Sequence, residues 1–498
     1  MTRQESSVVG GNLNAVGTLL AILAAAAVCG GCRGQATPEQ PPEEISAVRG
    51  VRTHLTIPKE LSFEEQIAIP VSEWETSTGG TCAVTELDFA GEAGDSPRLP
   101  GECTIVLAPL SSLPELVDAG WVASMTLNDD ALDARWDDVM EGLRNGMCRP
   151  GGEPGVLPVS CPVLACYYRS DLLEAAGKSP PETWDDYQTL LETLPDWAPE
   201  MAAVEPWGEE FRASLFLARA ASLALHPDSL SLYLDIQTGE PLIASEAFLR
   251  SLADMQAASP YLDQASLTLG PGECLREVTE GRAALAIGLP ASPTRDVPDS
   301  TDAGEGTAGG TIGVCPLPGS LSVFNRETGE WSDLSAESGP YRVTLAGFEG
   351  YAVCVHAGAT EPQQRASWNL WGMIEDDLQT SGEPPAWLPG ICRTSRLAGA
   401  RRSPMSGLPA STWQAHLEVA AKQLTSTRVA ADLPLPQRQR FREPLGEQVT
   451  RALTEDASPE DALQAVGDEW IELIEELGRQ RVLNTYRACL GLSPVSLP

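Results

Sequence analysis

The chain has 498 residues, of which 42% are hydrophobic and 21% are charged. At roughly 150 residues per domain this length favours two or three compact units, and the composition excludes both a chain disordered throughout and a membrane protein with several spans. Its 70 acidic and 33 basic residues give a net charge of −37, which disfavours binding to nucleic acid because phosphate groups are repelled.

The N-terminus carries an apolar run over residues 15–28 that follows a polar segment. The run is too short to span a bilayer and predicts the core of a signal peptide. Two glycines then precede Cys32, a pattern that resembles the cleavage and lipidation site of bacterial lipoproteins. We therefore predict a signal peptide over 1–31, a lipid on Cys32 and a proline-rich tether over 32–47. Secretion without a lipid is the alternative.

Ten cysteines remain once Cys29 and Cys32 are set aside, and an even number in an exported chain favours disulfides. Their pairing cannot be deduced from sequence, and buried free thiols are the alternative. The four histidines are scattered and no Cys-x-x-C pair remains, so neither a metal nor a cofactor is predicted. The ten are Cys82, Cys103, Cys148, Cys161, Cys166, Cys274, Cys315, Cys354, Cys392 and Cys489.

From about residue 48 the chain is expected to fold as strands and helices in alternation. Ser62, followed by Glu65, has the spacing of a capping box and predicts the start of the first helix. Apolar runs predict strands over 48–57, 82–88 and 103–107, and a short helix is expected over 114–120. This order is typical of an α/β domain.

A second unit is expected from about residue 156, with a helix capped by Thr183. Trp184 and Tyr187 lie at helical spacing on the buried face of that helix. The last predicted helix is capped by Ser458 and ends at Gly478. Before the Thr183 helix we expect a strand over 163–168. Between the two helices we expect strands over 282–289 and 345–356, a loop over 296–310, a hairpin over 320–332 and a helix from residue 362.

Signatures of catalysis are absent from the sequence. No G-x-S-x-G, H-E-x-x-H or G-x-G-x-x-G motif stands in a usable context. Gly177-Lys178-Ser179 fails as a phosphate-binding loop because Leu172 occupies the position of its first glycine. We therefore predict that the protein is not an enzyme.

The most specific family resemblance lies between residues 157 and 187. Residues 157–160 (LPVS), 166–173 (CYYRSDLL) and 181–187 (PETWDDY) resemble, in order, the proline strand, the "YYN-K-D-L" run and the "P-x-T-W-D-E" run of bacterial extracellular solute-binding proteins of family 1. Residues 105–109 (IVLAP) and 281–288 (GRAALAIG) resemble further segments of the family. The similarity covers roughly residues 48 to 480.

The resemblance implies a two-lobed periplasmic binding protein type II fold. Each lobe would be a mostly parallel sheet flanked by helices, with the chain crossing between the lobes at a hinge and a ligand in the cleft. Lobe one would comprise 48–160 plus 290–380, and lobe two 161–289 plus 381–490. The family also implies a monomer on the outer side of a bacterial membrane that delivers a small solute, commonly a sugar, to an ABC importer.

Ser111 and Ser112 are the first candidate ligand-binding residues. They follow a strand and open a helix, so their hydroxyls and the free backbone amides can donate to a polar ligand. The alternative is that Ser112 only caps the helix.

Glu205 and Trp207 belong to a Glu-Pro-aromatic loop that resembles a sugar-contacting loop of maltose-binding members of the family. An indole offers sugar rings an apolar face and a carboxylate accepts their hydroxyls. The polar residues that follow argue against burial of Trp207 in a core, and a surface turn is the alternative.

Three further candidates are Phe348, Glu349 and Arg393. Phe348 and Glu349 stand between two glycines at the start of a returning strand, which is a position at the cleft edge, or else only a turn. Arg393 could pair with an anionic group of a ligand, or only with a surface carboxylate.

The main hypothesis is a lipid-anchored solute receptor that captures a small molecule, a carbohydrate, for an ABC importer. One alternative is a secreted hydrolase on a similar two-lobed body, which needs an activated nucleophile or a metal that the sequence does not display. Another is a sensory or structural lipoprotein that kept the fold but lost transport.

Overall fold

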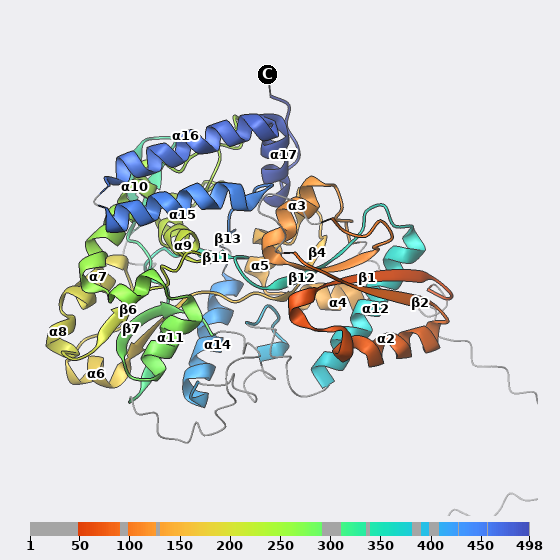
Figure 1. The fold of residues 1–498 in the computed structure, drawn as a ribbon, viewed down its shortest axis with the longest axis horizontal. Coiled ribbons are helices and arrows are strands. Elements are labelled where there is room, and N and C mark those ends of the chain that lie inside the picture. Colours follow the sequence, from red (N-terminus) through yellow and green to blue (C-terminus); the bar gives the residue numbers. More distant parts are fainter. Residues whose placement is uncertain are drawn as a thin grey trace, which may run out of the picture. The chain divides into compact units, whose positions relative to one another are not determined.

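The computed structural model describes residues 48–89, 98–125, 130–290, 310–334, 339–380, 390–397, 408–426, 428–455 and 457–497. The predicted signal peptide, Cys32, the tether and almost all of the loop over 296–310 lie outside the described residues. Two β-sheets organise the described chain (Figure 1).

The first sheet has the strand order β2-β1-β3-β12-β4. Its strands are β1 (Arg52–Pro58), β2 (Thr81–Leu87), β3 (Ile105–Pro109), β4 (Val156–Ser160) and β12 (Tyr351–Val355). The second sheet has the order β6-β7-β5-β8. Its strands are β5 (Ala165–Arg169), β6 (Ala202–Val204), β7 (Ala283–Gly288) and β8 (Ile312–Pro316).

In each sheet the strands run in one direction except for one strand. β12 is antiparallel to both β3 and β4, while β1 is parallel to β2 and β3. β5 is antiparallel to both β7 and β8, while β6 is parallel to β7. β5 is the first strand after the chain leaves the first sheet, and β12 is the strand by which it returns. The predicted mostly parallel sheets are therefore confirmed, and the crossing strands account for the exceptions.

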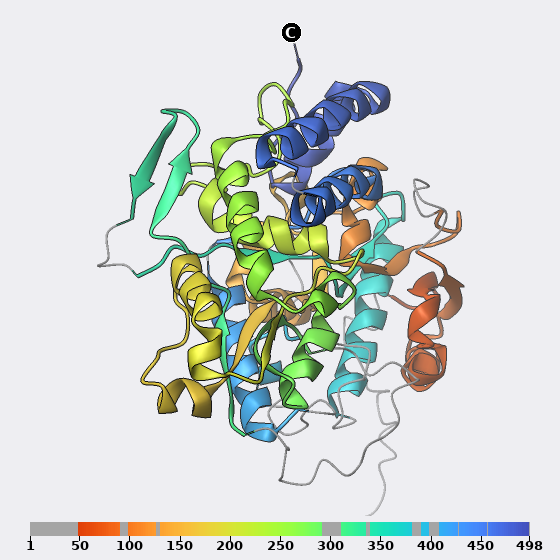
Figure 2. The same cartoon turned by 60° about the vertical axis from the view of Figure 1, so that its left-hand side comes forward.

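Two further strand pairs lie outside these sheets. The hairpin of β9 (Ser322–Asn325) and β10 (Glu330–Asp333) confirms the hairpin predicted over 320–332, and Figure 2 shows it standing apart from both sheets. β11 (Thr344–Ala346) pairs in parallel with β13 (Val429–Ala431). The strand predicted over 345–356 is thus divided into β11 and β12, because Gly347 and Gly350 have positive φ values of 87° and 100°.

Helices cover the sheets, and their buried side chains complete the hydrophobic cores. α2 and α12 pack on each other beside the first sheet, and α9, α10, α15 and α16 pack together above the second sheet (Figure 1). The longer helices are α2 (Glu64–Thr78), α9 (Arg212–Ala224), α10 (Glu246–Ala258), α12 (Glu361–Thr380), α14 (Ala410–Thr425), α15 (Arg438–Thr454), α16 (Pro459–Leu477) and α17 (Arg479–Cys489). The shorter ones are α3 (Leu113–Asp118), α4 (Asp130–Asp138), α5 (Glu141–Gly146), α6 (Ser170–Ala175), α7 (Trp184–Glu192), α8 (Leu194–Trp197) and α11 (Pro271–Thr279).

Separate hydrophobic cores make the chain two-lobed. One core surrounds the first sheet and contains Trp74 and Trp371, and the larger core of the second lobe contains Trp184 and Trp470. A smaller cluster at the second sheet contains Tyr167 and Cys274. Strand pairing assigns β8 to the second sheet, although residues 290–380 were expected in lobe one; the exact lobe boundaries stay a prediction.

The predicted helix caps have different outcomes. Thr183 forms a full capping box at the start of α7, because its Oγ1 accepts from Asp186 N at 3.1 Å and its own N–H donates to Asp186 at 2.9 Å. Ser458 caps α16 as predicted, but α17 follows that helix. The prediction for Ser62 is wrong: α2 begins two residues later without a side-chain cap, and Ser62 takes a left-handed conformation with φ 47°.

The disulfides expected from the even cysteine count are not formed. All ten cysteines are free thiols, and seven of them are buried. In the described ranges no group of three His, Cys, Asp or Glu side chains is placed to hold a metal ion. None of the helices that the structure describes is long and apolar enough to cross a bilayer.

Candidate functional site

The loops that follow the parallel strands of the first sheet form one side of the candidate site. A 3₁₀ turn over Lys59–Leu61 follows β1, and another over Leu110–Ser112 follows β3. Because β12 is antiparallel, its first residue, Tyr351, lies opposite Pro109 at the end of β3. Carboxyl ends of strands are where α/β sheets place ligands, so this edge is the candidate ligand edge of lobe one.

Gly350 fixes the loop that leads into β12. Leu110 N donates to Gly350 O at 2.9 Å. This bond holds Glu349, the residue before Gly350, beside the turn that follows β3. A Cβ atom at Gly350 would lie 2.3 Å from the carbonyl oxygen of Ser160, and φ there is 100°. A larger residue is excluded at this position, so the loop geometry is set by the glycine.

Ser111 and Ser112 lie at this edge in different environments. Ser111 is partly exposed, whereas Ser112 is buried at the N-cap of α3. The helix receives no side-chain cap from Ser112, so the alternative that this residue caps the helix is not supported. A recess of about 410 Å³, partly open to solvent, begins beside them and is lined from both lobes by residues that include Leu110, Gly347 and Asp432.

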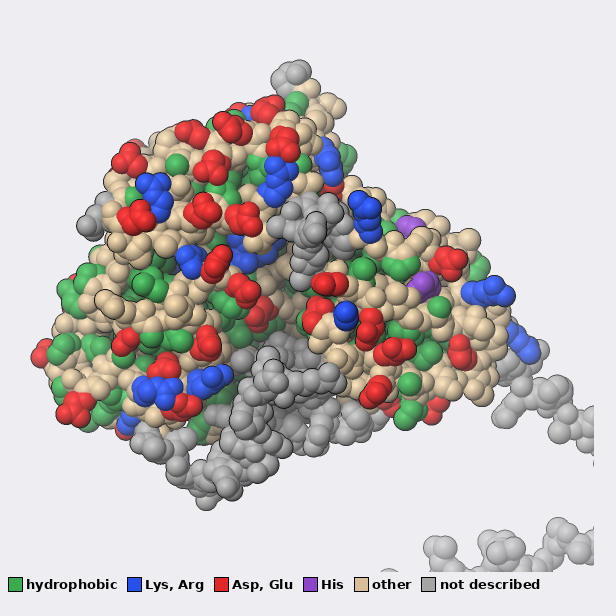
Figure 3. Space-filling view, viewed as in Figure 1, with side chains coloured by type: hydrophobic (Ala, Val, Ile, Leu, Met, Phe, Trp, Pro, Cys, Tyr) green, Lys and Arg blue, Asp and Glu red, His purple; other side chains and the backbone are tan. Residues whose placement is uncertain are grey.

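Glu349 connects this edge electrostatically with the second lobe. Burial raises the pKa of its carboxyl to about 7, and the charge of Glu210 adds to the rise. Glu210 lies in the loop between β6 and α9, so a charge of the second lobe acts on this carboxyl. Burial also raises the pKa of Tyr351, with contributions from the charges of Glu60 and Glu349. Figure 3 shows acidic side chains on both sides of a hollow in the middle of this face.

Arg442 of α15 supplies positive charge on the lobe-two side. Its guanidinium donates to Ser214 Oγ at 3.2 Å, while Ser214 donates to Asp432 at 2.8 Å. Burial and the nearby charge of Arg438 together lower the pKa of Arg442 to about 10, against the opposing effect of Asp432 and Glu210. Its Nε is buried without a hydrogen-bond partner. The site therefore combines carboxylates, a phenol, hydroxyls and one guanidinium.

Glu205 and Trp207 do not belong to this surface. The carboxylate of Glu205 is fully buried and accepts from Arg219 Nη1 at 2.8 and 2.9 Å. Trp207 is 3% exposed, and its Nε1 donates to Glu205 at 3.0 Å. The guanidinium of Arg219 also lies 4.3 Å from the ring of Trp184. The expectation that polar neighbours keep Trp207 out of a core is wrong, because backbone bonds to Ser266 and the buried ion pair satisfy the loop internally.

Arg393 and Phe348 also have partners within the protein. Arg393 is 1% exposed and lies 3.0 Å from Glu375, a fully buried carboxylate of α12. Both the expected ligand contact and the surface ion pair are therefore replaced by a buried ion pair. Phe348 is half-buried and packs against the core of the second lobe, which leaves Glu349 as the polar group of that loop.

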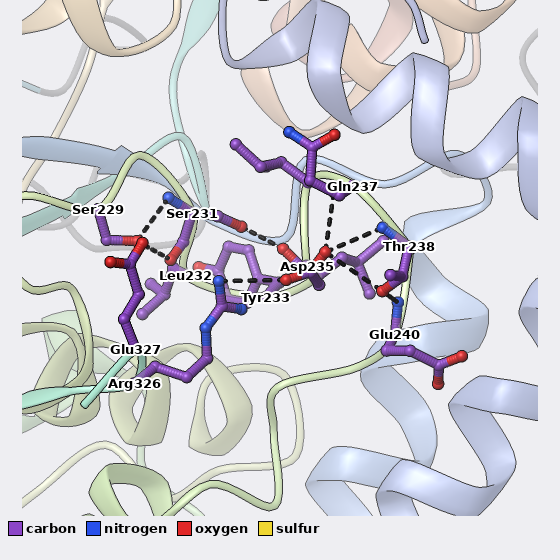
Figure 4. A network of polar contacts seen from close by, with 12 residues as sticks. Ser229, Ser231, Leu232, Tyr233, Asp235, Gln237, Thr238, Glu240, Arg326 and Glu327 are labelled. Carbon is purple, nitrogen blue, oxygen red and sulfur yellow. Dashed lines mark hydrogen bonds and ion pairs between the residues drawn. The ribbon is translucent and has the colours of Figure 1, made fainter. Parts of the chain in front are cut away.

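A second recess lies in lobe two, away from these loops. It has about 550 Å³ of empty space, partly open to solvent, and is lined by residues that include His226, Ser229 and Arg326. Figure 4 shows that its polar groups bond to one another: Arg326 pairs with Asp235 at 3.2 Å, and Ser229 donates to Ser231 O at 3.2 Å. The recess offers few unsatisfied groups, so we do not assign the ligand to it.

Sequence reasoning missed Glu60, Glu210, Tyr351 and Arg442. Glu60 follows the end of β1, as Ser111 follows that of β3, so the same strand-end rule would have found it. Tyr351 stands beside a candidate that was recognised. Nothing in the local pattern marks Glu210 or Arg442, because their importance comes from groups that are distant in sequence.

Substituting Glu349 with glutamine is expected to change the pH dependence of stability. The carboxyl keeps its proton up to about pH 7 in the folded protein but only up to about 4.5 in the unfolded chain, so the folded state binds more protons between these values. The free energy of unfolding therefore falls as pH rises through this window. We expect wild type to lose on the order of 2 kcal/mol more than the Glu349→Gln variant between pH 4.5 and 7.5.

Urea unfolding at several pH values measures this difference directly. Carboxylates that do not interact with Glu349 titrate equally in both proteins, so the difference between the two curves reports on Glu349 and its coupling to Glu210. Parallel curves would show that Glu349 titrates in the folded protein as it does in the unfolded chain.

Comparison with solved structures identifies the architecture. MalE, the sugar-binding protein from Xanthomonas citri, superposes with a TM-score of 0.59 at 18% identity and covers 86% of this chain and 98% of its own. A solute-binding protein of an ABC transporter from Agrobacterium radiobacter, solved with ribitol, has a TM-score of 0.56 at 17% identity, with 86% and 99% covered. The fold is that of ABC-transporter solute-binding proteins.

Other neighbours of this fold carry related descriptions. The cyclic alpha-maltosyl-1,6-maltose binding protein from Arthrobacter globiformis has a TM-score of 0.55 at 16% identity, with 86% of this chain and 99% of that one covered. No family model matches the sequence, and no curated protein matches it. The solved structures of the same fold confirm the predicted two-lobed α/β architecture.

Proposed function

We propose that this protein captures a small carbohydrate or polyol between its two lobes and delivers it to an ABC importer. The observation that carries the proposal is a recess at the strand ends of the first sheet that residues of both lobes line, among them Leu110, Gly347 and Asp432. Neighbours of the fold are described with ribitol and with a maltose-derived sugar. The protein acts as a monomer in this proposal, and the importer subunits are its partner.

The site chemistry suits hydroxyl-rich ligands. A protonated Glu349 donates one hydrogen bond and accepts others, while Ser111 and Tyr351 can do both. Arg442 adds donors only. Closure of the lobes over the ligand would bring these groups together and exclude water, so that each bond is stronger than in solution.

A thermal-shift screen of monosaccharides, oligosaccharides and polyols tests the proposal. A ligand present at about 100 times its Kd should stabilise the protein by about 2.7 kcal/mol. Glu349→Ala should abolish this shift, whereas Glu327→Ala, in the second recess, should leave it unchanged. A screen in which no compound raises the melting temperature would refute carbohydrate capture, and loss of the shift only in Glu327→Ala would move the site to the second recess.

We further propose that Cys32 becomes the mature N-terminus and carries the lipid that holds the protein at the outer side of a bacterial membrane. The apolar run over 15–28 and the small residues before Cys32 support this. Mass spectrometry of the membrane fraction should find an acylated Cys32, and Cys32→Ala should release the protein into the soluble fraction. An unmodified N-terminus at another residue would contradict the proposal.

A further inference from the structure

Two cysteines of lobe two lie directly opposite each other on neighbouring strands. Cys166 of β5 is the register partner of Cys315 of β8, and the two strands are antiparallel. Residues opposite one another in such a ladder have Cα atoms about 4.5 or 5.5 Å apart, and both distances lie within the range that a disulfide spans. Their side chains also point to the same face of the sheet.

The two side chains are near enough to interact, because Cys315 raises the pKa of the Cys166 thiol. Both are free thiols. Cys166 is fully buried, whereas Cys315 is partly exposed. Cys315 is therefore the more exposed residue of the pair, and its Sγ donates to Pro181 O at 3.9 Å.

None of the other eight cysteines within the described ranges has this arrangement. Cys274 is buried in lobe two, but the charged groups that act on it are carboxylates rather than thiols. A group in lobe one, made of Cys148, Cys161, Cys354 and Cys392, is near enough for mutual charge effects. Its members are all buried, and Cys354 has Val106 and Val156 as its register partners. None of this group combines direct opposition with exposure.

We propose that Cys166 and Cys315 are a modification site: they form an intramolecular disulfide when the folded protein meets a disulfide oxidant, such as oxidised glutathione or an oxidised dithiol protein. The thiolate of Cys315 attacks one sulfur of the oxidant, giving a mixed disulfide and releasing one thiolate. The thiolate of Cys166 then attacks Cys315 Sγ and expels the second thiolate. Two protein thiols are oxidised, the oxidant disulfide is reduced to two thiols, and the two protons that the protein thiols give up end on those thiols.

The proposed disulfide between Cys166 and Cys315 lies where it can stabilise the second lobe. Ala165 is the first residue of β5 and pairs with Pro316, so the cysteines lie one residue from the segment that links the first sheet to the second. The disulfide would close a loop of about 150 residues, and long loops gain the most from closure in the chain-entropy account. Oxidation is therefore expected to stabilise lobe two at the base of the hinge.

The second step controls the rate. The contact with Cys315 and burial hold the pKa of the Cys166 thiol well above its ordinary range, and the thiolate is the attacking species. Formation of the bond should accordingly be slow at neutral pH and faster as pH rises. A rate that is independent of pH between about 7 and 9 would contradict this order of steps.

Peptide mapping of the full-length protein tests the proposal. The reduced protein is incubated with oxidised glutathione, alkylated after denaturation without reductant, digested and analysed by mass spectrometry. We expect loss of two alkylatable thiols and a peptide linking Cys166 to Cys315. The melting temperature of the oxidised form should be about 5 °C or more above that of the reduced form.

Variants separate this pair from the other thiols. Cys315→Ala, at a partly exposed position, should keep all its remaining thiols reduced and show no gain in melting temperature on oxidation. Cys274→Ala, a buried cysteine of the same lobe, should oxidise as wild type does. All ten thiols remaining free after oxidation, or a peptide that links other cysteines such as Cys161 and Cys392 in place of this pair, would overturn the proposal.

Discussion

Replacing Trp207 with alanine is expected to lower the free energy of unfolding by about 3–5 kcal/mol, the range for removal of a large aromatic from a core. The indole is 3% exposed and belongs to the core of the second lobe. Its removal leaves a cavity and also takes away the donor that Trp207 Nε1 gives to the buried carboxylate of Glu205. Denaturant unfolding followed by circular dichroism measures the loss.

Trp331 provides the matched control for this substitution. It lies on the β9–β10 hairpin, is only half-buried and packs against Phe324. Trp331→Ala should therefore cost about 1 kcal/mol or less, as most substitutions outside the core do. Equal losses in the two variants would contradict the placement of Trp207 in the core, and so would weaker ligand binding by Trp207→Ala without any loss of stability.

The failure of the sequence argument for Trp207 has a physical reason. Glu205 looks like a ligand-binding carboxylate because nothing in its neighbourhood neutralises it. Its partner, Arg219, stands on α9 and reaches it only once that helix has packed into the core of the second lobe. A charge that is paired within the core cannot be distinguished, from sequence, from a charge kept for a ligand.

The elements themselves were largely predictable, because their signals are local. Thr183 and Asp186 are three residues apart, so their capping box can be read from the sequence. The same reasoning failed at Ser62, where the preceding turn over Lys59–Leu61 takes the serine into a left-handed conformation. Local spacing identifies a cap only where the chain before it is extended.

The candidate site was predictable on one lobe only. Ser111 follows a predicted strand and Glu349 stands between two glycines where a returning strand starts, and both were therefore expected at the cleft edge. Glu210 and Arg442 come from a loop and a helix of the other lobe, and only the tertiary structure brings their charges together. The half of a cleft that depends on contacts between lobes therefore needs the structure.

Removing the carboxylate of Glu375 is expected to destabilise the protein by about 3–5 kcal/mol, because it leaves buried arginine charge without a partner. Glu375 is fully buried and lies 3.2 Å from Arg135, 3.0 Å from Arg393 and 2.7 Å from Arg396. Arg393 is itself 1% exposed, so water cannot replace the lost carboxylate. Glu361→Ala, on the same helix, breaks an exposed pair with Arg365 and should cost only about 0.5 kcal/mol. Urea unfolding of both variants measures the two changes in the free energy of unfolding. Similar small decreases in both would mean that Arg393 is solvated, and Arg393 would again be a candidate ligand-binding residue.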